Sequence, residues 1–136
     1  MDEKNTHQLE LGRYWLDKAK RSYEAAEDAF QKNNYDFCVN RLYYSAFYAV
    51  SAVLIINGKN YKKHSAVRSA VHRDFVKNGK ISIELGKLYD KLLRDREEAD
   101  YVAFVEFDPE VVKDELKETK KFINQFKEIF AKEVSK

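Results

Sequence analysis

The chain has few residues of the kinds that form disulfides, bind zinc or break helices. Its one cysteine, Cys38, cannot form an internal disulfide, and no Cys/His cluster offers zinc ligands. One proline and four glycines in 136 residues leave few points at which a helix must end. An excess of one charge is also lacking, since 25 Lys and Arg oppose 23 Asp and Glu for a net charge of +2. These shortages favour a helical protein, and its bulk charge indicates neither a nucleic acid nor a membrane as ligand.

The motifs of several common chemistries are missing as well. The sequence has no GxxxxGK[ST], GxGxxG or HExxH motif, and no Glu-x-x-His pair of the carboxylate-bridged metal bundles. We therefore expect neither a metal site nor a cofactor. The polar first ten residues are unlike a secretion signal, which predicts a cytoplasmic protein. Tyrosines and serines interrupt the uncharged stretch 42–58, which favours a buried central helix over a membrane span.

What the chain does contain is helix-forming sequence with a regular apolar period. Apolar residues recur at steps of three and four along residues 9–31, 38–57 and 108–136. A shorter helix is predicted over about residues 64–78, and a fourth long helix begins after a Ser82 cap. The length suits a single core. The sequence thus predicts one domain over residues 1–136, an all-α antiparallel up-and-down bundle of four long helices plus one short helix.

Residues 100–108 are aromatic and apolar but lack a helical period. They fit either an extended segment that covers the core or a strained continuation of the fourth helix, and we expect the extended cover. Asp108 followed by Pro109 marks the start of the fifth helix, with Asp as the N-cap and Pro at the first helical position.

The second predicted helix carries a stripe of polar side chains in an otherwise apolar sequence. The stripe has steps of three and four and consists of Arg41, Tyr44, Ser45, Tyr48 and Ser51. Each polar group on a buried helix needs a partner or a ligand. The stripe therefore either pairs internally, faces a second subunit or binds a ligand.

The end of the fourth helix is the second informative place. The apolar stripe through Leu85, Leu88 and Leu92 brings Arg96 onto or beside the buried seam, one turn before Asp100. Tyr101 follows and offers an aromatic ring with a hydroxyl. Arg96 and Asp100 either form an internal salt bridge that holds the helix end or position a ligand.

The short helix opens at His64, which either caps it or contributes to a site. Its basic side chains either contact phosphates or are simply solvated, and they are Lys62, Lys63, Arg68, Arg73 and Lys77.

Taken in order, the segments RLYYSAFYAVSAVL, FVKNGKISIELGKL and REEADY resemble the HEPN domains (higher eukaryotes and prokaryotes nucleotide-binding), in particular their small stand-alone prokaryotic branch. The resemblance covers about residues 9–130. Its most specific residues are Arg41 with Tyr43 and Tyr44, and Arg96 with Ala99, Asp100 and Tyr101.

The resemblance implies a helical bundle that is commonly a homodimer and is often encoded beside a minimal nucleotidyltransferase, as a toxin and antitoxin pair. Active members of the family are metal-independent ribonucleases with an Arg, a polar residue and, a few residues later, a His. Arg96 and Glu97 match the first two positions, whereas Asp100 and Tyr101 stand where the His is expected, and no His follows His72. Since a positioned His contributes about 10² to 10⁴ in rate, its absence favours binding over cleavage.

We therefore predict a nucleotide- or RNA-binding component of a nucleotidyltransferase-linked toxin–antitoxin type system, homodimeric and not bound to a membrane. The alternatives are a metal-independent ribonuclease toxin, with Arg96, Asp100 and Tyr101 as catalytic candidates, and a purely structural dimerisation module. The predicted ligand-binding residues are Arg41, Tyr44, Tyr48, His64, Arg96, Asp100 and Tyr101.

Overall fold

The computed structural model describes residues 3–136, which form helices joined by short connections. In chain order the elements are α1 (Glu3–Gln31), α2 (Tyr35–Ile56), α3 (His64–Ala70), the π-helix η1 (Val71–Val76), α4 (Ile83–Tyr101) and α5 (Pro109–Val134). The predicted all-α bundle is confirmed. Helix α1 begins at Glu3 rather than near residue 9. The prediction followed the apolar residues, and the first residues of α1 are polar but still favour helix.

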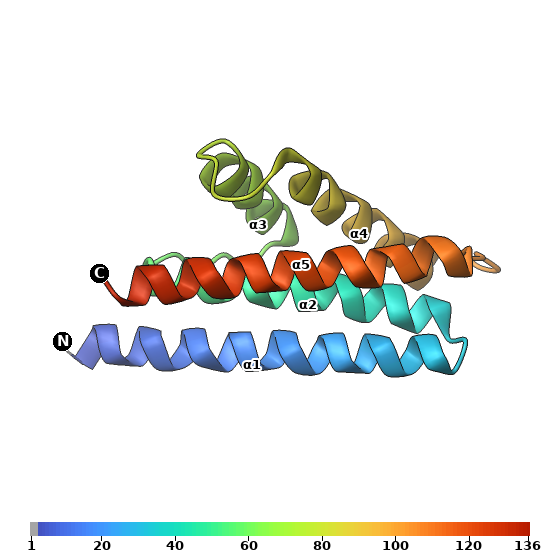
Figure 1. The fold of residues 1–136 in the computed structure, drawn as a ribbon, viewed down its shortest axis with the longest axis horizontal. Helices are drawn as coiled ribbons and strands as arrows, with labels where there is room; N and C mark the ends of the chain where they lie inside the picture. The colour runs from blue at the N-terminus through green and yellow to red at the C-terminus, as the bar shows by residue number, and fades with distance from the viewer. Residues whose placement is uncertain (1–2) are drawn as a thin grey trace.

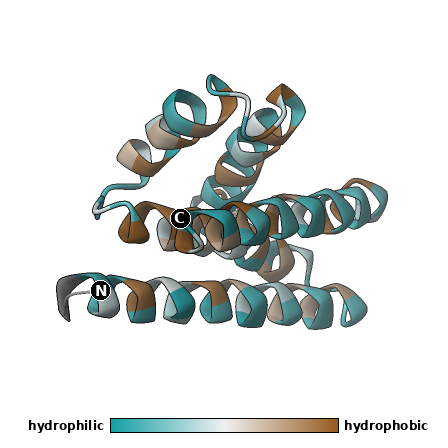
Figure 2. Cartoon of the chain, turned by 60° about the vertical axis from the view of Figure 1, so that its left-hand side comes forward, coloured by the Kyte–Doolittle hydropathy of each residue, from teal (hydrophilic) through white to brown (hydrophobic). Residues whose placement is uncertain are grey.

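Helices α1, α2 and α5 run alongside one another, and α3 and α4 lie on the side of them that is opposite α1 (Figure 1). Both chain ends lie at the same end of the bundle, and the loop between α4 and α5 lies at the other end (Figure 1). Each helix is hydrophilic on one side and apolar on another (Figure 2), as the three-and-four periodicity predicts.

Helix α2 is the centre of the core, since it contacts α1, α4 and α5. Half of its residues are buried, among them Leu42, Tyr43 and Val53. The prediction of a buried central helix is therefore confirmed. By length and composition α2 would also pass as a membrane-spanning helix, so its tyrosines and serines do not by themselves exclude a span. Its burial against the other helices is what identifies it as a core helix.

Local capping places the helix starts where the sequence predicts them. The Ser82 hydroxyl accepts a hydrogen bond from the Leu85 amide at 3.1 Å, and the Asp108 carboxylate accepts one from the Glu110 amide at 2.9 Å. Each satisfies an amide that has no partner within its helix. The prediction is therefore confirmed for both α4 and α5.

The short predicted helix is not uniform. It continues as an α-helix to Ala70, becomes a π-helix from Val71 to Val76, and ends two residues before Asn78. The π-helix η1 meets α4 at Gly86. A Cβ atom added at Gly86 would lie 2.7 Å from Val76 Cγ2. Glycine is thus needed at this crossing because the two helices approach closely.

The expectation that residues 100–108 cover the core in an extended form is met only in its second half. Helix α4 continues to Tyr101, and the Phe104 side chain is 100% exposed. Phe104 also has a left-handed backbone (φ 60°), which is uncommon for a bulky residue. Residues 105–108 are not helical, and Phe107 among them is partly buried against the core.

Candidate functional site

The Arg96 side chain points into the bundle. It comes from the last turns of α4, is only 14% exposed, and its guanidinium carbon lies 5.6 Å and 5.5 Å from the ring centroids of Tyr43 and Tyr44 on α2. These are cation–π distances. Its Nε lies 3.2 Å from Asp100 Oδ2 but makes no aligned hydrogen bond with the described side chains, residues 5–136. The guanidinium is therefore positioned by two rings and one carboxylate.

Asp100 links Arg96 to a second arginine through an asparagine. Asn40 Nδ2 donates to Asp100 Oδ1 at 3.0 Å, and Asn40 Oδ1 accepts from Arg41 Nε at 3.0 Å and Arg41 Nη2 at 2.7 Å. The Arg41 guanidinium carbon lies 5.0 Å from the Tyr44 centroid. Two guanidiniums thus contact the ring of Tyr44, and the Asp100 carboxylate lies beside Arg96.

His64, the first residue of α3, lies against the same tyrosines. Its Nδ1 is 2.6 Å from the Tyr43 hydroxyl, and its ring centroid lies 5.5 Å and 5.9 Å from those of Tyr43 and Tyr44. Tyr89 on α4 donates a longer hydrogen bond of 3.5 Å to the Tyr43 oxygen. Burial raises the pKa of Tyr43 to about 12, so its hydroxyl keeps its proton at neutral pH. The residues gathered here are named the Arg96 cluster: Asn40, Arg41, Tyr43, Tyr44, His64, Arg96 and Asp100.

The charge state of His64 follows from its place in the cluster. Burial lowers the pKa of His64 below its usual value, and the positive charge of Arg96 lowers it further, against a smaller opposite effect of Glu97. A depressed pKa leaves the imidazole mainly neutral at pH 7. A neutral ring has one N–H donor and one acceptor nitrogen, and its Nδ1 is the nitrogen paired with the Tyr43 hydroxyl.

We expect the substitution Arg96→Gln to raise the pKa of His64, because it removes the nearby positive charge that disfavours the imidazolium. The measurement is an NMR titration of the three histidine ring signals, with the signal of His64 assigned from its absence in His64→Gln. Arg13→Gln, which removes an exposed guanidinium on α1, is the matched control and should leave the His64 pKa unchanged. An unchanged pKa in Arg96→Gln would contradict the proximity of the two side chains.

Comparison with known proteins identifies the family of the chain. The sequence model of the HEPN domain matches residues 13–129. The chain belongs to the HEPN domain family. A UPF0332 protein of Thermotoga maritima is 37% identical over 116 residues, which cover 85% of this chain and 88% of that one. A protein of Methanocaldococcus jannaschii named "Putative toxin MJ0142" is 36% identical over 112 residues, 82% of this chain and 76% of that one.

Five of the side chains that the sequence nominated in this HEPN protein lie together in the Arg96 cluster: Arg41, Tyr44, His64, Arg96 and Asp100. Tyr48 adjoins the cluster, 5.8 Å from Tyr44 between ring centroids, but it stacks on Trp15 of α1. Tyr101 is 77% exposed and lines an open hollow of about 660 Å³ beside Arg96. Each is thus near the cluster without being part of its network.

The predicted polar stripe on α2 needs a correction. Ser45 is fully buried, and its hydroxyl donates to the Leu42 carbonyl at 2.7 Å. Ser51 likewise donates to the Phe47 carbonyl at 2.8 Å. Serines on helices commonly make such bonds to the preceding turn, so their presence does not signal a ligand. The partly exposed side of α2 instead carries Phe47 between Tyr44 and Ser51.

Sequence reasoning missed Asn40, which bridges Arg41 and Asp100, and Tyr89, which bonds to Tyr43. Asn40 precedes Arg41 directly, a spacing at which helical side chains point in different directions. Tyr43 appeared only within the family resemblance, and its burial beneath His64 and Arg96 could not be read from helical spacing.

Proposed function

We propose that this HEPN protein binds the phosphate of a nucleotide or of RNA at the Arg96 cluster. The observation that supports the proposal most is the Arg96 guanidinium itself, which is mostly buried and whose Nε makes no aligned hydrogen bond with the described side chains, residues 5–136. A cation in a site of low dielectric favours an anionic ligand with oxygen acceptors. Arg41 contributes a second guanidinium against the same Tyr44 ring.

The proposal extends to the cellular role. We propose that the protein is the nucleotide- or RNA-binding component of a cytoplasmic toxin–antitoxin type pair whose other member is a nucleotidyltransferase. The printed name of the archaeal relative includes the word toxin, which supports this role. We also propose a homodimer, supported by the exposed apolar side chains Phe37, Val102 and Phe104 near the end of the bundle where α2 begins. Light scattering that shows a monomer at micromolar concentration would contradict the dimer.

Binding is tested by titration of the protein with ATP and with a short single-stranded RNA. Arg96→Ala is expected to weaken binding at least about tenfold at ~0.1 M salt and to reduce its salt dependence by about one phosphate contact. Arg13→Ala, with the same loss of charge on α1, should bind like the wild type. Equal binding by wild type and Arg96→Ala would remove Arg96 from the binding site. The absence of binding by the wild type itself would favour the structural dimerisation module.

A second candidate function, metal-independent RNA cleavage, is favoured by one observation. His64 of α3 lies against the same two tyrosine rings as Arg96, although no His follows Arg96 in its own helix. Arg96 would stabilise charge that develops on the phosphate, and His64 would move a proton. Incubation of bulk RNA with the protein in EDTA tests this function, and the absence of cleavage at high protein concentration would exclude it.

A further inference from the structure

A second hollow opens beside the Arg96 cluster, between α1, α2, α3 and the loop that joins α2 to α3. It has a volume of about 260 Å³. We call it the aromatic pocket, and it is lined by Trp15, Phe47, Ser51, Leu54, Ile55, Lys59, Asn60, Tyr61, Lys62 and Val67. None of these residues belongs to the Arg96 cluster.

The lining of the aromatic pocket combines three kinds of group. The rings of Trp15, Phe47 and Tyr61 are partly exposed and offer flat apolar faces. Trp15 is held in place, since it stacks on Tyr48 at 5.5 Å between ring centroids. The Asn60 amide offers polar contacts at the edge, and exposed lysines stand at the rim. Flat faces, polar edges and cations together suit a nucleotide, with its planar base and its phosphate.

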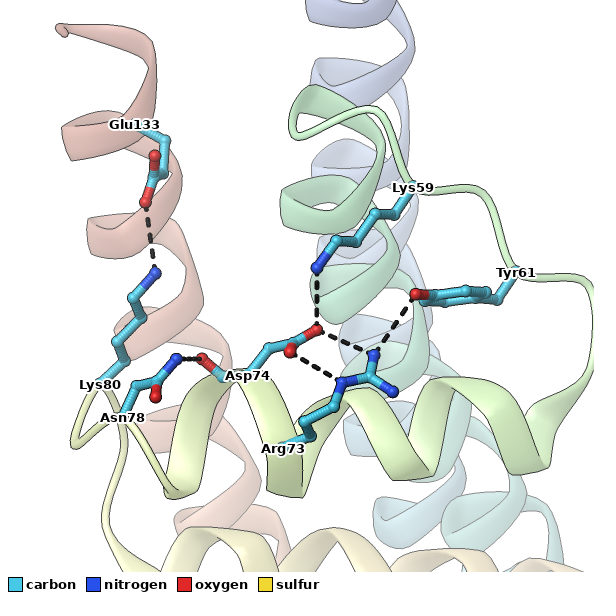
Figure 3. A network of polar contacts seen from close by, with 7 residues as sticks. All are labelled: Lys59, Tyr61, Arg73, Asp74, Asn78, Lys80 and Glu133. Carbon is cyan, nitrogen blue, oxygen red and sulfur yellow. Dashed lines mark hydrogen bonds and ion pairs between the residues drawn. The ribbon is translucent and has the colours of Figure 1, made fainter.

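The loop wall of the pocket is fastened to η1 by a polar network (Figure 3). Lys59 Nζ lies 3.2 Å from Asp74 Oδ2, Arg73 Nε donates to Asp74 Oδ1 at 2.9 Å, and Arg73 Nη2 donates to the Tyr61 hydroxyl at 3.3 Å. Lys59 and Tyr61 are therefore anchored on the side of the pocket. One carboxylate, Asp74, opposes Lys59 and Arg73 in this network, and Lys62 has no ion-pair partner among the described side chains, residues 5–136. The rim is thus positive, with Lys62 available for an anion.

Phe47 connects the pocket to the Arg96 cluster. Its ring lines the pocket and lies 4.7 Å from the His64 ring and 5.9 Å from the Tyr43 ring, between centroids. His64 in turn lies 5.9 Å from the Tyr44 ring, on which the Arg96 guanidinium carbon lies at 5.5 Å. The partly exposed rings of Phe47, His64 and Tyr44 therefore connect the pocket wall to the proposed phosphate site. Two cationic sites joined by partly exposed rings suit two successive nucleotides of one strand.

We propose that the aromatic pocket binds the base of the nucleotide that adjoins the phosphate held at Arg96, with Lys62 on the next phosphate. The ligand is then single-stranded RNA, because bases in a duplex are stacked and paired and cannot enter a side pocket. This inference rests on the proposed phosphate binding at the Arg96 cluster and adds a base-binding subsite to it. It names the substrate class as an oligonucleotide of at least two residues rather than a free nucleotide.

Trp15 supplies the test, since it is the only tryptophan of the chain and lines the pocket. Titration with AMP and with an oligoadenylate of four residues is followed by tryptophan fluorescence and, separately, by calorimetry. We expect the oligonucleotide to quench Trp15, and AMP to bind without comparable quenching. Lys62→Gln should weaken oligonucleotide binding about fivefold and leave AMP binding unchanged, since it removes one phosphate contact. Lys77→Gln, at another exposed lysine beyond η1, is the matched control.

The outcomes separate the two proposals. If Arg96→Ala binds both ligands like the wild type, the proposed phosphate site fails. If Arg96→Ala weakens binding but the oligonucleotide neither quenches Trp15 nor responds to Lys62→Gln, the phosphate site stands and the aromatic pocket is overturned as a subsite. Equal quenching by AMP and the oligonucleotide at equal affinity would also overturn it, because the pocket would then take a free nucleotide.

Discussion

On the second proposed function, RNA cleavage, the substitution His64→Gln is expected to lower the rate of cleavage in EDTA by about 10² to 10⁴-fold, because a positioned His contributes this much by proton transfer. The same substitution should leave RNA affinity within about threefold, since the affinity comes mainly from cation–phosphate contacts. Glutamine keeps a planar polar group opposite the Tyr43 hydroxyl, which lies 2.6 Å from His64 Nδ1. The measurements are single-turnover cleavage of a labelled RNA and its binding to the same variant.

His72→Gln is the matched control for this substitution. His72 lies on η1, is 39% exposed, and its Nε2 lies 2.9 Å from Asp90 Oδ1 rather than in the Arg96 cluster. It should cleave like the wild type. An equal loss of cleavage rate in His64→Gln and His72→Gln would show that the effect comes from a disturbed fold of α3 and η1 rather than from proton transfer by His64. Unchanged cleavage in His64→Gln would show that another group moves the proton.

The second large effect concerns a buried carboxyl between α4 and α5. The Glu115 side chain is 4% exposed, and its oxygens accept no aligned hydrogen bond within residues 3–136. Lys91 Nζ lies 3.2 Å from Glu115 Oε1. Burial, together with the neighbouring carboxyl of Asp95, nevertheless raises the pKa of Glu115 to about 8, and Lys91 only partly opposes this. The folded protein therefore keeps a proton on Glu115 at pH values where the unfolded chain has lost it.

The free energy of unfolding is therefore expected to fall as the pH rises from about 5 to 8. Between the ordinary pKa of a Glu, near ~4.3, and its raised value, the folded state binds more protons than the unfolded state, so alkali favours unfolding. Each pKa unit corresponds to about 1.4 kcal/mol, which makes the total loss a few kcal/mol. Urea denaturation at intervals from pH 5 to pH 8.5 measures it.

Glu115→Gln should flatten this pH profile and stabilise the protein at pH 8, because the amide is neutral at every pH and nearly the same shape. Glu118→Gln, one turn later on α5, removes an exposed carboxylate that pairs with Lys121 and is the control. Its pH profile should follow that of the wild type. A steep profile that persists in Glu115→Gln would place the responsible proton on another group.

The sequence by itself predicts the helices and the contacts within each of them. Ser82 and Asp108 mark helix starts because their side chains bond to amides only two or three residues away. The Arg96–Asp100 pair is predictable for the same reason, since a step of four places both side chains on one face of α4. The sequence also identifies α2 as the buried centre, because most of its side chains are apolar and few could form a solvent-exposed polar face.

The site itself is decided by how the helices pack. Arg96, His64 and Tyr43 lie on three different helices, and Asn40 bonds to Asp100 across 60 positions of the chain. Tyr101 lies one residue beyond Asp100 and so points in a different direction from α4. Only the packing of the helices shows that this direction leads to solvent. The loop after it exposes Val102 and Phe104 but packs Phe107 against the core. Local propensity thus determined the helices of this HEPN protein, whereas only the packing of one helix on another brought a histidine next to the arginine.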